Sequence, residues 1–317
     1  MEEEYWHMVR KRKFLILVTL GLGLLISSLG FGIDQIGQTT KPAQAASTKP
    51  IRVVSSLNFY GETAKAVAGT HGQVTSVINS AAVEPHEYKP TTKQAKQVAK
   101  ANVVIQNGLG YDGWMKKLAK STNNTKALVN VADVIGKADG ANEHIWYQPK
   151  TMSKLADTLA NSYAKLDPTH KADYQANAAK YKAKLAKLNQ VIDDTKQKVD
   201  PANNKVDVSE PVFNYALANL GYQVNNPHFA KAVEDSTDPS PKDIQQIQND
   251  MKKHKIAFFV NNSQETNSTV KNLLKTAKQS NIPVLKVTET KPDGKTYLQW
   301  MTDQYKALQK IQARQIK

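Results

Sequence analysis

The stretch Glu84-Pro85-His86-Glu87-Tyr88-Lys89-Pro90 lies between a β-type run at residues 74–78 and a helical pattern at residues 91–100. Each proline fixes its own φ angle and restricts the residue before it, so the histidine between them is held in a rigid loop. A rigid imidazole directly after a strand suits a metal ligand. A single histidine in a loop is more often an ordinary surface residue, and this stretch alone leaves both interpretations open.

Outside this loop, short β-branched runs alternate with helical patterns along most of the chain. Such alternation is typical of a parallel sheet whose strands are connected by helices. The glycine-rich residues 107–114 contain neither the dinucleotide-binding fingerprint nor the Walker lysine, so we interpret them as a turn into a helix. Strands are predicted at residues 51–55, 74–78, 102–106, 127–131, 206–209, 256–260 and 283–287, and shorter helices at residues 61–69, 91–100, 151–165, 212–220, 242–253, 268–280 and 297–312.

A long helical segment separates the two strand-rich regions. It begins at Asp167 and Pro168, which are typical of an N-cap and a first helical position, and it extends to about Lys198. A coiled-coil dimer is the alternative, but fewer than three heptads with Ala and Tyr in the seam make a weak zipper. We expect a monomer of two α/β lobes joined by this helix, which packs through one apolar stripe: Tyr174, Ala178, Tyr181, Leu185, Leu188 and Ile192.

The composition is that of a basic globular protein without cysteine. The 317 residues include 43 Lys+Arg against 28 Asp+Glu, a formal net charge of +15. The lysines are scattered over helix faces and no nucleic-acid-binding motif occurs, so we expect no nucleic acid partner; attraction to an anionic cell envelope surface is a possible use of the charge. The absence of cysteine excludes disulfides, thiolate metal sites and lipid attachment through a lipobox cysteine.

The N-terminal residues have the pattern of a secretory signal. Basic residues 10–13 precede an apolar run at residues 14–33, and an Ala-x-Ala site ends at Ala45. We expect cleavage after Ala45. An uncleaved anchor is the alternative, because about 20 apolar residues are long enough to span a bilayer. In both cases the rest of the chain is extracytoplasmic, and it is secreted or associated with the cell surface.

Four polar residues follow predicted strands or lie in the loops after them. In open α/β sheets, ligands bind beyond the carboxyl ends of the strands. The first lobe offers His86 and His144 there, and the second offers Glu210 and Glu289. Two imidazoles and two carboxylates suit Zn²⁺ or Mn²⁺.

Some of these assignments have alternatives. Glu210 precedes a proline and could be only a helix-start charge. Asp293, in a nearby loop, could replace Glu289. We expect the carboxylates that flank the two histidines to be solvated; these are Glu84, Glu87 and Glu143.

Five motifs carry a resemblance to a known family: the Glu84–Pro90 stretch, residues 107–114, His144-Ile145-Trp146, Asp167-Pro168 and residues 209–215. Together they resemble the TroA-like metal-binding proteins, the cluster A-I substrate-binding components of manganese and zinc ABC importers. The resemblance covers about residues 51–315 and implies two lobes, a rigid linking helix and a four-ligand site between the lobes. It places His86 and His144 at the two histidine positions of the first lobe. Glu210 falls where manganese-type members carry Glu and many zinc-type members carry His.

The chain also departs from this family. Glu289 stands where the family usually has Asp, Glu143 precedes the second histidine where Pro is common, and the His-rich loop of many zinc-specific members is missing. The Glu at position 210 and the missing loop favour manganese. The resulting division is a signal peptide at residues 1–45, an N-terminal metal-binding lobe at 50–167, a linking helix at 168–199 and a C-terminal metal-binding lobe at 200–317.

The predicted function is capture of Mn²⁺ or Zn²⁺ between the lobes and delivery of this ion to an ABC transporter permease. The metal is then a transported ligand, and the protein is not an enzyme. A metal-dependent surface adhesin is one alternative. A metallohydrolase is another, but neither H-E-x-x-H nor G-x-S-x-G occurs in the chain.

Overall fold

The computed structural model describes residues 49–264 and 267–315, and both lobes belong to one compact unit, Thr48–Lys317. The predicted signal peptide lies outside the described residues. No helix in the described part of the chain has both the length and the apolar character needed to cross a membrane.

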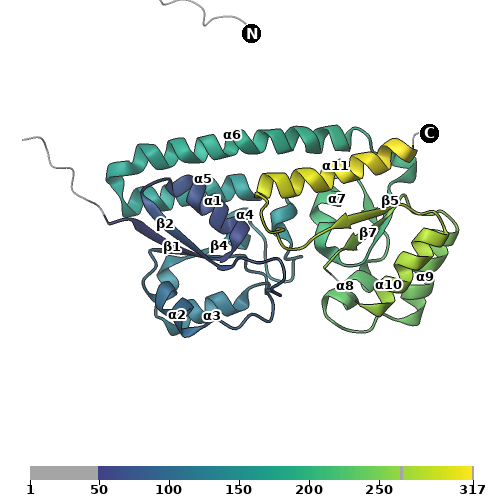
Figure 1. Ribbon diagram of the computed structural model, residues 1–317, viewed down its shortest axis with the longest axis horizontal. Coiled ribbons are helices and arrows are strands. Elements are labelled where there is room, and N and C mark those ends of the chain that lie inside the picture. Colours follow the sequence, from purple (N-terminus) through teal and green to yellow (C-terminus); the bar gives the residue numbers. More distant parts are fainter. Residues whose placement is uncertain (1–48, 265–266, 316–317) are drawn as a thin grey trace, which may run out of the picture. The chain divides into compact units, whose positions relative to one another are not determined.

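The first lobe is a four-stranded parallel sheet with the order β2-β1-β3-β4 (Figure 1). The central strand β1 is almost entirely buried, as is usual for a parallel strand covered by helices on both faces. Thr91 and Gln94 form a capping box that fixes the start of α2. The elements are β1 (Ile51–Leu57), α1 (Asn58–Ala68), β2 (Gly72–Ile78), α2 (Thr92–Ala99), β3 (Val103–Gln106), α3 (Gly113–Ser121), β4 (Leu128–Asn130), α4 (Val131–Ile135) and α5 (Thr151–Leu166).

The second lobe repeats this arrangement with the order β6-β5-β7-β8, again all parallel. Pro241 at the first turn and the Ser240 side chain, which accepts from the Asp243 amide, begin α9. The elements are β5 (Lys205–Val208), α7 (Asn214–Leu220), β6 (Gln223–Val224), α8 (Pro227–Glu234), α9 (Pro241–Lys252), β7 (Phe259–Asn262), α10 (Ser268–Gln279), β8 (Val284–Val287) and α11 (Tyr297–Gln315).

The long helix α6 (Lys171–Lys196) joins the lobes, after a 3₁₀ turn at Pro168–His170. Its 26 residues extend over about 39 Å, and it packs on α1 and α5 of the first lobe and on α7 and α11 of the second (Figure 1). All six residues of the predicted stripe are buried. The predicted fold class, two parallel α/β lobes joined by one long helix, is confirmed.

Aromatic side chains link the two lobes in one hydrophobic core. The ring of Tyr147, from the first lobe, lies 5.1 Å from that of Phe213 and 5.8 Å from that of Trp300. The single hydroxyl hydrogen of Tyr147 is shared between two acceptors of the second lobe, the Thr288 carbonyl at 2.5 Å and Gln304 Oε1 at 2.8 Å. These contacts bring the residues that follow the strands of the two sheets close to one another.

The sequence-based element pattern misses the short elements. It omits α4, β6 and α8, which have 5, 2 and 8 residues. It also places the third strand of the second lobe at residues 256–260, whereas β7 is Phe259–Asn262. Residues 256–258 are buried without forming strand, so an apolar run alone did not locate the strand.

Candidate metal centre

The loop between β2 and α2 carries His86 and is fixed by contacts around it. Pro85 is buried, and its carbonyl accepts a hydrogen bond from the Trp114 indole at 2.9 Å. Tyr88 packs on the same indole, with ring centroids 5.0 Å apart. The backbone amide of His86 donates to Glu84 Oε1 at 3.1 Å. These contacts hold the His86 imidazole beyond the carboxyl end of the sheet, with 37% of the side chain exposed.

The glycine-rich turn after β3 is built around a buried carboxylate. Asp112 accepts hydrogen bonds from the backbone amides of Asn107 and Gly108, at 2.7 and 3.0 Å. Gly108 has a φ of 86°, and a Cβ atom there would lie 2.1 Å from Asn130 Oδ1, so the turn requires glycine. The residue presented by this turn is Tyr111, which is fully buried.

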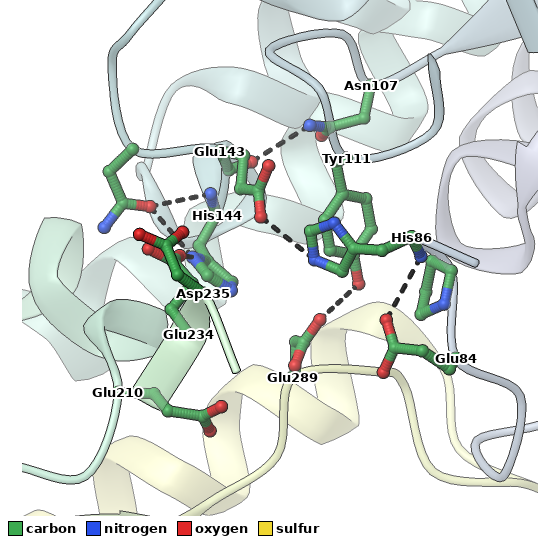
Figure 2. A network of polar contacts seen from close by, with 12 residues as sticks. Glu84, His86, Asn107, Tyr111, Glu143, His144, Glu210, Glu234, Asp235 and Glu289 are labelled. Carbon is green, nitrogen blue, oxygen red and sulfur yellow. Dashed lines mark hydrogen bonds and ion pairs between the residues drawn. The ribbon is translucent and has the colours of Figure 1, made fainter. Parts of the chain in front are cut away.

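Tyr111 lies between the candidate ligands of both lobes (Figure 2). Its ring is 4.8 Å from that of His86 and 6.1 Å from that of His144, centroid to centroid. Its hydroxyl donates a 2.8 Å hydrogen bond to Glu289 Oε1 in the second lobe. One side chain therefore contacts three of the four predicted metal ligands.

His144 is held by Asn142, two residues before it. Asn142 Oδ1 accepts hydrogen bonds from the backbone amide and Nδ1 of His144, at 2.8 and 2.9 Å. The Asn142 amide donates to the Pro211 carbonyl at 2.7 Å, and its backbone carbonyl accepts from the Tyr215 hydroxyl at 2.7 Å. An acceptor at Nδ1 places the proton of the neutral ring there and leaves Nε2 to bind a metal.

The two carboxylates of the second lobe lie on either side of Asn262, at the end of β7. The Asn262 amide donates to Glu210 Oε2 at 2.7 Å and to Glu289 Oε2 at 3.4 Å. Glu210 and Glu289 each follow a strand, β5 and β8, after one intervening residue. Glu210 also directly precedes the 3₁₀ turn that begins at Pro211. Asn262 and Tyr111 thus connect the predicted ligands of both lobes.

Within the described residues, two groups of His and Glu side chains have ligand atoms close enough for one metal ion, within 4.8 Å of one another. The predicted ligands divide between them: His86 and Glu289 fall in one group, His144 falls in the other, and Glu210 belongs to neither. Glu210 is connected to the first group through Asn262. The first group is Glu84, His86 and Glu289, and the second is Glu143, His144 and Glu234.

Glu143, a member of the second group, also contacts His86 of the first group. Its Oε1 lies 3.0 Å from His86 Nε2, and its side chain is only 12% exposed (Figure 2). The expectation that Glu143 is solvated is therefore wrong, because the carboxylate turns inward to pair with His86. Asp293, the alternative to Glu289, is exposed, accepts a hydrogen bond from the Ala81 amide at 3.3 Å, and belongs to neither group.

The electrostatics of the two histidines are opposite. Burial alone would lower the pKa of His86, but the hydrogen bond and charge of Glu143 raise it to about 9. Burial and the nearby positive charge of His86 lower the pKa of His144 to about 3. Burial raises the pKa values of Glu289 and Glu234 to about 7, with further contributions from neighbouring carboxylates. Without metal, a protonated His86 thus partly neutralises a cluster of carboxylates, and His144 keeps a free lone pair at neutral pH.

Sequence reasoning missed the residues that support and extend this centre. Tyr111 was visible only as part of a turn motif, and Asn142 and Asn262 have no signal of their own. Glu234 is the last residue of α8, and Pro227 at the first position of this helix is a sequence signal for a helix start. Recognising that helix would have shown that Glu234 stands at a helix end, but not that it lies near His144.

Comparison with known proteins identifies the family. Residues 53–311 match the model of the family described as zinc-uptake complex component A, periplasmic (ZnuA). The chain belongs to this family.

The ZnuA-family assignment agrees with other similarities. The chain is 29% identical to the manganese-binding lipoprotein MntA of Halalkalibacterium halodurans over 133 residues, which are 40% of this chain. It is 25% identical to the iron-binding protein YfeA of Yersinia pestis over 139 residues, or 42% of this chain. The matched part spans 44% of the length of each of these relatives. The fold is that of the periplasmic zinc-binding protein TroA from Treponema pallidum, with a TM-score of 0.69 and 17% identity over 84% of this chain and 99% of that one.

Proposed function

We propose that this protein is an extracytoplasmic solute-binding protein that captures a divalent transition metal between its two lobes and delivers it to an ABC importer. The observation that carries the proposal is the convergence of two imidazoles and two carboxylates, from opposite lobes, around Tyr111 and Asn262. Binding and release suffice for this role, and no catalysis is required. In this proposal residues 1–45 are the export signal, and residues 50–167 and 200–317 are the two metal-binding lobes.

The proposed ligands are His86 and His144 from the first lobe and Glu210 and Glu289 from the second. A mixed nitrogen and oxygen set without sulfur fits Mn²⁺ and Zn²⁺. The names of the relatives include manganese, iron and zinc. We favour Mn²⁺ as the cargo, because the surroundings are rich in carboxylates and a hard cation prefers oxygen ligands.

Division of the ligands between lobes supplies a means of release. A small displacement of one lobe relative to the other moves two ligands away from the ion, and affinity depends steeply on that geometry. A permease that binds the two lobes in a slightly different arrangement would therefore weaken the site. The metal would then leave without any chemical step.

Metal analysis of the purified mature protein tests this proposal. We expect about one equivalent of Mn²⁺ or Zn²⁺ in the wild type, and a higher melting temperature with metal than with a chelator. His86→Ala and Glu210→Ala should each lower the affinity at least 100-fold, so that neither retains metal after desalting. His228→Ala is the matched control, because His228 is exposed and belongs to neither of the two groups of potential metal ligands found among the described residues. Full metal content in both site variants would contradict the proposal.

A further inference from the structure

Glu234 is a carboxylate of the second lobe that points toward His144 of the first. It ends α8, and its Oε1 lies 3.6 Å from His144 Nδ1 (Figure 2). The side chains of Glu234 and His144 are only 13% and 2% exposed. Together with Glu143, they bring one nitrogen and two oxygens within 4.8 Å of one another.

One oxygen of this carboxylate is buried without a hydrogen-bond partner. Glu234 Oε1 is inaccessible to solvent, and no donor in the described part of the chain reaches it. The other oxygen, Oε2, is 3.4 Å from Lys231 Nζ at the surface. A buried carboxylate oxygen without a donor is costly, and a cation bound beside His144 would satisfy it.

A cavity of about 750 Å³ lies beside this group. Glu143 and Glu234 line it from opposite lobes, and His86 lies at the same cavity. An ion that enters the cavity meets Glu143 and Glu234, and of the predicted four-residue site it meets His86. The side chains of the group are thus largely buried, and the cavity beside them provides a path by which a metal ion can approach.

We propose that Glu143, His144 and Glu234 form a second position for a divalent transition metal, adjacent to the four-residue site and sharing His144 with it. This inference rests on the proposed function, since His144 serves both positions. An ion beside Glu234 would use His144 Nδ1, the nitrogen 3.6 Å from Glu234 Oε1, whereas an ion in the four-residue site would use Nε2. A neutral imidazole offers one lone pair, so filling the second position moves the ring proton from Nδ1 to Nε2, and an ion occupies one position or the other and not both. An ion held first at the second position moves to the four-residue site by exchanging Glu143 and Glu234 for His86, Glu210 and Glu289.

Removal of His86 separates the two positions. His86→Ala deletes a ligand of the four-residue site but none of the second position, and it releases Glu143 from the 3.0 Å contact with His86. We expect this variant to bind one equivalent of Zn²⁺ or Mn²⁺ weakly in calorimetric titration. Adding Glu234→Gln should weaken that binding at least 10-fold further. Adding Asp235→Asn, which removes the same charge one residue away and outside the group, should leave it unchanged.

The outcomes separate the two proposals. A wild type that binds no metal overturns the proposed function. Two results would overturn only the second position when the wild type binds metal tightly. One is that His86→Ala binds no metal, and the other is that adding Glu234→Gln to His86→Ala causes no further loss of affinity. Melting curves in chelator show whether each variant is folded. If the double variant is unfolded, Glu234→Asp takes the place of Glu234→Gln. It shortens the side chain but keeps its charge, and we again expect weaker binding.

Discussion

The two lobes have the same strand order, and in each the described residues include one aspartate with no exposed surface, Asp112 and Asp207, but the surroundings of the two carboxylates differ. In the first lobe, Asp112 accepts hydrogen bonds from two backbone amides, at 2.7 and 3.0 Å. In the second lobe, both carboxylate oxygens of Asp207 are buried without a hydrogen-bond donor among the described residues. In the same architecture, the buried carboxylate of Asp112 thus stabilises a turn, whereas the buried carboxylate of Asp207 has lost its hydration without gaining hydrogen bonds in return.

The protonation of the two groups reflects this difference. Burial raises the pKa of Asp207 to about 7, and the negative charge of Asp250 adds to the shift. Burial also raises the pKa of Asp112, but hydrogen bonds to its carboxylate oppose the shift. Since Asp112 closes the turn that presents Tyr111, its donors also position the candidate metal centre. Asp207 faces the carboxylate of Asp250, whose nearest cation is Lys255 at 4.0 Å.

The largest expected effect is a gain in stability from Asp207→Asn. A folded-state pKa raised from 3.8 to about 7 favours folding below pH 4, and this contribution is lost as the pH rises through 7. At pH 8 the variant should therefore be more stable than the wild type by about 3 kcal/mol, since the amide needs no deprotonation and can donate to Asp250. Urea unfolding of the metal-free protein at pH 8 measures this difference.

The same measurement at pH 4.5 is the internal control for Asp207→Asn. The wild-type Asp207 is protonated in the folded protein there, so most of the gain should disappear. An equal gain at both pH values would show that the effect is one of packing and not of charge.

The opposite sign is expected for Asp112→Asn in the first lobe. An amide has one acceptor oxygen, so its NH₂ group would face a backbone amide donor of Asn107 or Gly108. We expect a loss of about 2 kcal/mol in the free energy of unfolding at pH 8, from one unsatisfied buried donor. Urea unfolding beside Asp207→Asn checks this. Equal changes in both variants would remove the proposed difference between the lobes.

The sequence was sufficient for the fold because the fold depends on local patterns. Strands such as β1 and β8 are recognisable as short β-branched runs, and the stripe on α6 repeats over about 19 residues. Elements as short as β6 carry too few residues to show a period. Strand ends pointed to the four candidate ligands, since parallel strands bring their carboxyl ends to one edge.

The partners of these ligands could not be predicted in the same way. Asn142 and Pro211 are 69 residues apart, and Tyr111 and Glu289 are 178 apart. No local pattern relates residues at such separations, because the contacts depend on how the lobes pack. Glu143 illustrates the same limit: its sequence neighbours suggest a solvated loop, while packing turns it toward His86.

Asn142 is where the first lobe is connected to the second, and its two functions can be separated. Asn142→Ala removes both the acceptor at His144 Nδ1 and the donor to the Pro211 carbonyl. We expect metal affinity to fall about 10-fold, a typical cost of losing the partner that orients a ligating histidine. Asn142→Asp keeps an acceptor for His144, loses the donor to the Pro211 carbonyl and adds a negative charge.

Calorimetric titration of both variants distinguishes orientation of the histidine from linkage of the lobes. If orientation of the histidine dominates, Asn142→Asp should bind metal nearly as the wild type does. Nitrogen NMR of His144 should then report a proton at Nδ1 in Asn142→Asp and a mixture of tautomers in Asn142→Ala. If both variants lose affinity equally while the tautomer of His144 stays fixed, the contact with Pro211 is the one that matters. The first lobe would then depend on the second for the geometry of its own ligand, and the two lobes could not be treated as independent halves of the site.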